Sequence, residues 1–217
     1  NNIDLVIPKN PYWADNGILI ADPDGFKIVF AIRHLVLESI DDLTKQVKDN
    51  GLLNWNDLIE FVKALPYGRN ANREDLSLVL LEKKGTCSSK HAFLKKVADL
   101  NGFENVKLIL AMYRMNHINT PKIGDTIAKH GLDFIPEAHC YLMLNNQRID
   151  ITNSQSDIER LRNEILEEIE INADQVNVFK VDYHKLYLEQ WIAQNGIDSS
   201  FEKVWEIREA CIRQLEA

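Results

Sequence analysis

The sequence predicts an α+β protein in which helical segments flank a short antiparallel sheet. Apolar residues recur at helical spacing before about residue 102 and again after about residue 156, whereas residues 138–152 alternate as strands do. With 217 residues, the chain is long enough to bury a sizeable core. We expect a helical or irregular extension over residues 1–70 and a core with C-terminal helices over residues 71–217, together forming one compact unit.

The N-terminal half is predicted to hold one short strand and several helices. Residues 1–16, rich in Asn, Asp and Pro, are typical of an irregular arm, and residues 17–21 of a short strand. Residues 26–38 are mostly apolar, so strand and helix both stay open there. Capping residues, stop signals and apolar spacing predict helices between Ser39 and Gly51, over 54–64 and over 72–84.

The rest of the chain is predicted to alternate between helix and strand. Thr86 caps a helix that ends at Gly102, and a buried strand follows over 106–112. Asn145-Asn146 is the expected turn of a hairpin, because Asn tolerates left-handed backbone. The later segments are a hairpin over 138–144 and 148–152, acidic helices between Ile158 and Asp174, a strand over 176–181 and a final amphipathic helix over 200–216.

Composition and charge disfavour several classes of function. Lys and Arg number 25 against 33 Asp and Glu, a net charge of −8 without a basic block, so we expect no nucleic-acid partner. No apolar run of about 18 residues occurs, so we expect no membrane span. The three cysteines are too scattered for a disulfide framework or a cysteine-rich zinc site, and no nucleotide or calcium motif is present. We therefore expect no cofactor and no metal.

The sequence says less about compartment and assembly. The chain begins Asn-Asn, and no charged segment followed by an apolar one is present. This pattern favours a cytoplasmic protein, and export with a leader already removed stays open. The oligomeric state is not predicted.

Cys87 is the strongest candidate for a nucleophile. It follows Gly85-Thr86 at a predicted helix start, where unpaired amide groups and the helix dipole favour a thiolate. The same amides can hold an oxyanion. A buried structural cysteine is the alternative, because free Cys is among the most buried residue types.

His139 and Asp150 are the candidates for a base and its orienting partner. With a two-residue turn, Leu144 faces Gln147, which makes His139 and Asp150 diagonal neighbours on one face of the hairpin. That face is the more polar one, whereas Cys140 falls on the opposite, apolar face and is expected to be structural. Each residue also has a simpler interpretation when it is considered alone. His139 fits a half-exposed histidine on a strand, and Asp150 fits a charged surface residue of a hairpin.

Three motifs, in this order, resemble the transglutaminase-like superfamily. They are Gly85-Thr86-Cys87 opening a helix, His139-Cys140-Tyr141 on a strand and Asp150-Ile151-Thr152 on the next, within a stretch from about Leu76 to Asn153. Tyr141 stands where many members carry Trp, and the Arg that often follows the strand-leading Gly is absent after Gly102. The resemblance implies a papain-like core with Cys87 as nucleophile, His139 as general base and then acid, and Asp150 orienting the imidazole.

The resemblance also implies a reaction. We expect a thiol enzyme that forms an acyl-enzyme at Cys87 from an amide or peptide bond of a peptide or protein, then hydrolyses it or transfers it to an amine. A catalytically silent member that binds a protein partner stays open, as does acyl transfer from a thioester, as in arylamine acetyltransferases. The candidates for an oxyanion donor or a cleft residue are Tyr67, Asn70, Asn72 and Tyr141.

Some of the same residues have other interpretations. His91 lies four residues after Cys87 on the same helical face, and we expect it to be a packing or solvated histidine. Cys87, His139 and Asp150 are all metal-ligand types but lack the closely spaced pair of most structural sites. The acidic run after Ile158 is typical of a solvated face, with a docking surface for a basic partner as the alternative.

Overall fold

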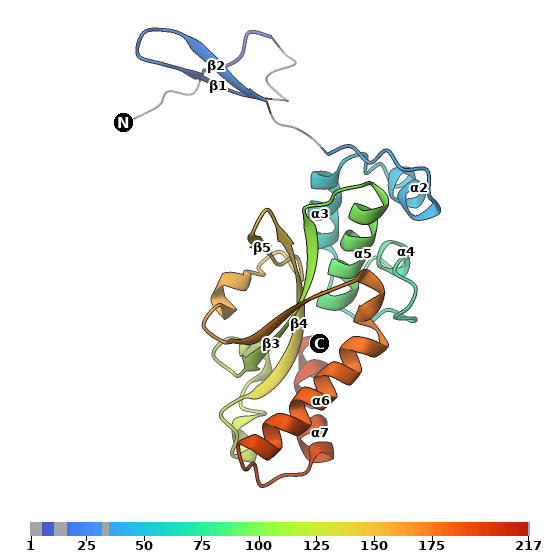
Figure 1. Cartoon of the computed structure of the whole chain (residues 1–217), viewed down its shortest axis with the longest axis vertical. Helices are drawn as coiled ribbons and strands as arrows, with labels where there is room; N and C mark the ends of the chain where they lie inside the picture. The colour runs from blue at the N-terminus through green and yellow to red at the C-terminus, as the bar shows by residue number, and fades with distance from the viewer. Residues whose placement is uncertain (1–5, 11–16, 32–34, 217) are drawn as a thin grey trace.

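The computed structural model describes residues 6–10, 17–31 and 35–216. Within these residues, the fold is α+β, as predicted: a four-stranded antiparallel sheet is combined with helices (Figure 1). A separate two-stranded sheet precedes it, formed by β1 (Gly17–Ala21) and β2 (Lys27–Ala31). Parts of the predicted N-terminal arm, residues 1–5 and 11–16, lie outside the described residues.

The four-stranded sheet has the order β5-β4-β3-β6. Its two central strands are long because they bury side chains on both faces, whereas the two edge strands are shorter. The strand predicted over 106–112 extends to Met115. The bounds are β3 (Val106–Met115), β4 (Ile135–Leu144), β5 (Gln147–Ile149) and β6 (Ile165–Ile171).

The hairpin of β4 and β5 has the predicted register. Leu144 pairs with Gln147 across the turn Asn145-Asn146, whose φ angles of 49° and 64° are those of a left-handed, primed hairpin turn. β5 ends at Ile149, so Asp150 follows the strand instead of lying within it, which corrects the predicted extent to Thr152.

Most of the predicted helices are present. α2 (Asp42–Asp49) and α3 (Trp55–Ala64) begin at side-chain caps, Asp41 and Asn54, which accept hydrogen bonds from N–H groups of the first turn. Gly51, with φ of 80°, follows α2 as the predicted stop. The last two helices are α6 (Val178–Gln194) and α7 (Phe201–Glu216), and α7 has the predicted extent.

The predicted helix over 72–84 is wrong for most of its length. Only α4 (Leu78–Leu81) is helical, because the preceding polar side chains bind the backbone instead. Asn72 accepts from Glu74 N–H at 3.0 Å, and Asp75 accepts from Ser77 N–H at 3.0 Å. Such local bonds compete with helical ones.

Two predictions after Ser156 are also wrong. The acidic segment forms the short 3₁₀ turn η3 (Ile158–Leu161) and then β6. It is a strand because it hydrogen-bonds to the edge of β3 that β4 leaves open, where Ile169 pairs with Leu110 and Ile171 with Leu108. The strand predicted over 176–181 is instead the end of η4 (Ala173–Val176) and the first turn of α6. Short apolar runs do not distinguish a strand from a buried helical turn.

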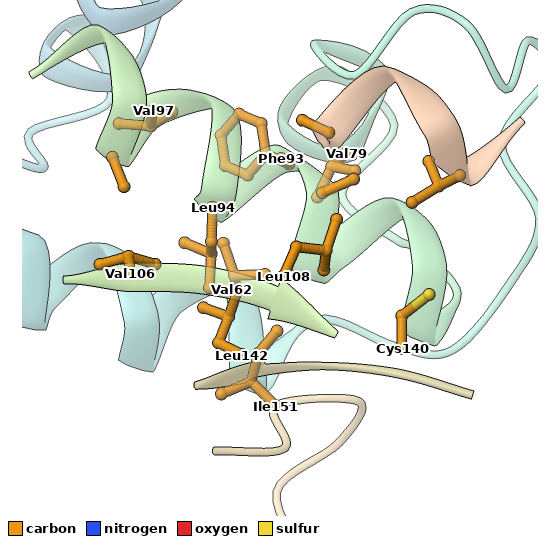
Figure 2. Close-up of a cluster of buried hydrophobic side chains, with 14 of the residues drawn as sticks. Val62, Val79, Phe93, Leu94, Val97, Val106, Leu108, Cys140, Leu142 and Ile151 are labelled. Atoms are coloured by element: carbon orange, nitrogen blue, oxygen red, sulfur yellow. The ribbon is translucent and has the colours of Figure 1, made fainter. Parts of the chain in front are cut away.

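The core lies between α5 (Cys87–Leu100) and one face of the sheet. Figure 2 shows Phe93 and Leu94 of this helix beside Leu108 and Leu142 of the strands, and all four are fully or almost fully buried. Cys140 lies in this core, as predicted for a structural cysteine. Residues between 35 and 65, including Leu37, Val47, Trp55, Leu58 and Val62, belong to the same core as the segments after residue 71.

The hairpin turn generates a stability prediction. Asn146→Val places a β-branched residue in left-handed backbone and should lower the free energy of unfolding by about 1–2 kcal/mol. Asn146→Gly should leave that free energy unchanged or raise it, because glycine adopts this conformation without strain. Urea denaturation of both variants measures the difference, and a valine variant as stable as the glycine one contradicts this turn geometry.

Candidate active site

The N-terminus of α5 is built to present Cys87. Thr86 caps the helix, accepting from Ser89 N–H at 3.3 Å, while the Ser89 hydroxyl accepts from Thr86 N–H at 2.9 Å. Gly85 is required before this cap, because a Cβ there would lie 2.8 Å from Lys90 Cγ and 2.9 Å from Ser89 Oγ. Cys87 is the first helical residue, and its own N–H therefore has no acceptor within the helix.

His139 and Asp150 are brought together across the hairpin. His139 Nε2 lies 2.9 Å from Asp150 Oδ2. The second carboxylate oxygen accepts from Thr152, at 2.9 Å from its N–H and 2.6 Å from its hydroxyl. Burial alone would raise the pKa of Asp150, but the charge and hydrogen bond of His139 hold it well below its usual range.

Cys87 and His139 border the same cavity, and the charge of the imidazole acts on the sulfur. Since Nε2 of the imidazole faces Asp150, Nδ1 is the nitrogen left for the sulfur. Burial alone would raise the pKa of the thiol, but the charges of Lys180 and His139 lower the pKa of Cys87 to about 6. Burial opposes the charged imidazole, yet Asp150 and the thiolate raise the pKa of His139 well above its usual value. The arrangement therefore favours a thiolate beside an imidazolium.

Lys180 supplies a second positive charge from α6. Its Nζ donates to Ser88 Oγ at 2.6 Å, and that hydroxyl lies 3.8 Å from Cys87 Sγ. The residue is 92 positions from Ser88 in sequence and belongs to no motif, so no sequence signal marks it. Its charge stabilises the thiolate electrostatically.

Two further residues of α5 fasten the helix to the segment that carries Asp150. His91 is fully buried; its Nδ1 donates to Cys87 O at 2.6 Å, and its Nε2 accepts from Ile151 N–H at 2.9 Å. Burial lowers the pKa of His91 to about 4, so the ring is neutral and this tautomer is fixed. Lys90, also fully buried, donates to Leu65 O at 2.5 Å and Thr152 O at 2.8 Å. His91 is thus a packing histidine with a defined positioning role.

Cys87 lies between two cavities, although only 9% of its surface is exposed. The smaller cavity, about 210 Å³, is bordered by the N-terminus of α5, α6 and α7. The larger cavity, about 460 Å³, is bordered by His139, Asp150 and the loop over 153–157. A substrate reaching Cys87 can therefore extend to both sides of the sulfur.

The four candidate cleft residues occupy different places. Tyr67 borders both cavities beside Cys87. Asn70 borders the smaller one, but its amide nitrogen already contacts Leu78 O, Glu82 Oε2 and Lys84 O. Asn72 and Tyr141 border neither; Asn72 caps a local turn, and the buried Tyr141 hydroxyl lies 3.2 Å from Arg148 Nε. Of the four candidates, Tyr67 is thus the one that borders both cavities.

The face shared by His139 and Tyr141 is less polar than predicted. Tyr141 is completely buried and packs with Ile109, Ala111 and Ile158 in a second apolar cluster. Residues of η3 cover this face of the sheet, so the hairpin is enclosed on both sides. The enclosure removes water from around His139, whose side chain is only 14% exposed.

A buried ion pair beside the site was not anticipated from the sequence. Arg208 of α7 contacts both carboxylate oxygens of Glu137, at 2.5 and 2.7 Å. Burial opposes the charged carboxylate, but Arg208 lowers the pKa of Glu137 to about 2. The pair fixes α7 against β4 next to Cys87.

The described part of the chain has neither a cluster of metal-ligand side chains nor a membrane-spanning helix. Among those residues, no group of three or more His, Cys, Asp or Glu side chains is arranged to hold a metal ion. No helix there is both long and apolar enough to cross a membrane.

Comparison with known proteins gives one short match. The family model of the YycE-like C-terminal domain matches residues 3–31, which include β1 and β2 but none of the candidate site residues. Comparisons with curated proteins and with solved structures found no significant match. The interpretation of the site therefore rests on its own geometry.

The His91 contacts generate a second prediction. His91→Phe leaves the Ile151 N–H and the Cys87 carbonyl without their buried partner, so the free energy of unfolding should fall by about 2 kcal/mol or more. His117→Phe is the matched control on an exposed turn and should change it by less than about 0.5 kcal/mol. Chemical denaturation measures both. Equal stability of the two variants contradicts the role assigned to His91.

Proposed function

We propose that this protein is a transglutaminase-like thiol enzyme with a papain-like core, which forms an acyl-enzyme at Cys87 from an amide or peptide bond. One juxtaposition carries the proposal: a thiol at a helix start borders the same cavity as His139, and the imidazole of His139 lies 2.9 Å from Asp150. A nucleophile, a base and an orienting group in this order are what acyl transfer requires.

In the first half-reaction, the proton of the Cys87 thiol resides on His139 Nδ1 and the thiolate attacks the substrate carbonyl carbon. A carbon–sulfur bond forms, and the carbonyl oxygen becomes an oxyanion. The imidazolium then gives its proton to the amide nitrogen as the carbon–nitrogen bond breaks. The amine leaves, and a thioester remains on Cys87.

The oxyanion is stabilised by the start of α5. The Cys87 N–H has no acceptor within the helix and points outward at its N-terminus, where the helix dipole favours negative charge. Tyr67 borders both cavities beside Cys87 and is the side-chain candidate for a second donor.

In the second half-reaction, water attacks the thioester. His139 takes a proton from the water, a carbon–oxygen bond forms, and the carbon–sulfur bond breaks to return the thiolate. Hydrolysis is the simpler outcome, since water needs no binding site of its own. Transfer to an amine instead requires that the amine enter the larger cavity beside His139.

Acyl-enzyme formation is the direct test. Incubation with p-nitrophenyl acetate, an activated acyl donor, should give a burst of one p-nitrophenol per chain and one acetyl group on Cys87 by peptide mapping. Cys87→Ser should abolish the burst. His139→Ala should slow acylation by at least about 10²-fold, the usual contribution of a general base.

The outcome also separates an enzyme from a silent relative. Cys140 and Cys211 are fully buried, so acetylation there instead of at Cys87 contradicts the assigned nucleophile. If Cys87 is not acylated at all, the proposed enzymatic function is wrong, and a module that only binds a protein partner is favoured. Addition of a primary amine to the acylated protein then distinguishes transfer from hydrolysis.

A further inference from the structure

The two cavities beside Cys87 differ in their access to His139. His139 borders only the larger of the two, whereas Thr86, Cys87, Ser88 and Ser89 at the start of α5 border the smaller one. In the proposed reaction the imidazolium protonates the leaving amine, so the leaving group must lie on the His139 side. The acyl portion of the substrate therefore extends into the smaller cavity.

The smaller cavity is rich in positive charge. It is bordered by five basic side chains and two carboxylates, and both carboxylates are already paired. Glu137 is held by Arg208, while Glu209 contacts Arg208 at 2.6 Å and Arg69 at 3.1 Å. Both negative charges of the cavity wall are therefore neutralised by arginine side chains.

Three cations of this wall have no carboxylate partner within 4.0 Å among the described residues: Arg73, Lys180 and Lys185. Lys180 donates to the Ser88 hydroxyl, and Lys185 Nζ lies 5.6 Å from the centre of the Trp205 ring. Arg73 and Lys185 are exposed at the mouth, and Lys180 is partly buried beside the sulfur. The cations therefore extend from the opening to the nucleophile.

This concentration of positive charge stands out in a chain whose net charge is −8. The larger cavity has no such excess: Asp150, Asp157 and Glu137 border it together with Lys122, Arg160 and the imidazolium of His139. A positive cavity in an acidic protein attracts anions selectively, because low-dielectric walls focus the field. Apolar groups of Val176, Val181 and Ile212 line the remaining wall and suit a short aliphatic stem.

We propose that the smaller cavity binds an anionic group, a carboxylate or a phosphoryl group, on the acyl side of the substrate. This inference rests on the proposed function and adds a substrate class to it. Acidic peptides are acyl donors that would suit this cavity. Their negative side chain would be directed to Arg73 and Lys185 while the scissile carbonyl lies at Cys87.

Matched alkylating probes test the inference without knowledge of the natural substrate. Iodoacetyl-glutamate amide and iodoacetyl-glutamine amide have nearly equal size and differ by one negative charge, and iodoacetyl-phosphoserine amide supplies the phosphoryl group. The rate of Cys87 alkylation is followed by mass spectrometry at pH 7 and low salt. We expect at least one anionic probe to react about fivefold faster than the glutamine probe, as for a well-placed surface ion pair.

Charge variants locate the effect. Arg73→Gln combined with Lys185→Gln should reduce the anionic-to-neutral rate ratio to about one, because both positions are exposed and their charges face the smaller cavity. Lys122→Gln removes a positive charge from the larger cavity and should keep the ratio of the unmodified protein. Comparison of the glutamate and phosphoserine probes shows which anion is preferred.

Each contrary result has a defined meaning. Rapid alkylation of Cys87 by the glutamine probe without any anionic preference overturns this inference and leaves the thiolate chemistry intact. A preference that persists in the Arg73/Lys185 double variant also overturns it. If no probe modifies Cys87, the proposed function and the inference both fail.

Discussion

The site depends on the two bonds of one buried histidine. His91 joins the carbonyl of Cys87 to the N–H of Ile151, and the neighbouring Lys90 joins the same helix to Thr152. Cys87 and Asp150 belong to segments 63 positions apart, and these contacts fix one against the other. His139 then lies between them on β4, placed by the hairpin register. A neutral, buried His91 is essential to this arrangement, because a protonated ring could not accept from Ile151.

The electrostatics of the site follow from this placement. Burial disfavours every charge, yet Asp150, His139, Cys87 and Lys180 lie close enough for opposite charges to compensate one another. This compensation favours a thiolate at Cys87 near neutral pH, in a largely enclosed space. The proposed nucleophile, its acid and base partner and the cationic wall of the smaller cavity would act as one electrostatic unit. This unit distinguishes Cys87 from Cys140 and Cys211, whose pKa values burial raises.

Local sequence signals predicted those parts of the structure that local chemistry determines. Thr86 before Cys87 predicted the cap, and Asn145-Asn146 predicted the turn and the register that brings His139 to Asp150. Segments whose structure depends on distant partners were not predictable in this way. Residues 165–171 carry a pattern compatible with helix, and the open edge of β3 makes them a strand. Lys180, Arg208 and the pairing of His91 with Ile151 also arise from tertiary contacts, so no spacing in the sequence marks them.

The pH dependence of Cys87 alkylation tests the central claim, that His139 and its neighbours hold Cys87 as a thiolate. Iodoacetamide reacts with the thiolate, so its rate against pH reports the pKa of the sulfur. The unmodified protein should show a midpoint near the pKa of about 6 given by the geometry, and His139→Ala should move the midpoint upward toward about 8.5, the value of an ordinary cysteine. A midpoint near 8.5 in the unmodified protein, or one that His139→Ala leaves in place, would contradict the account.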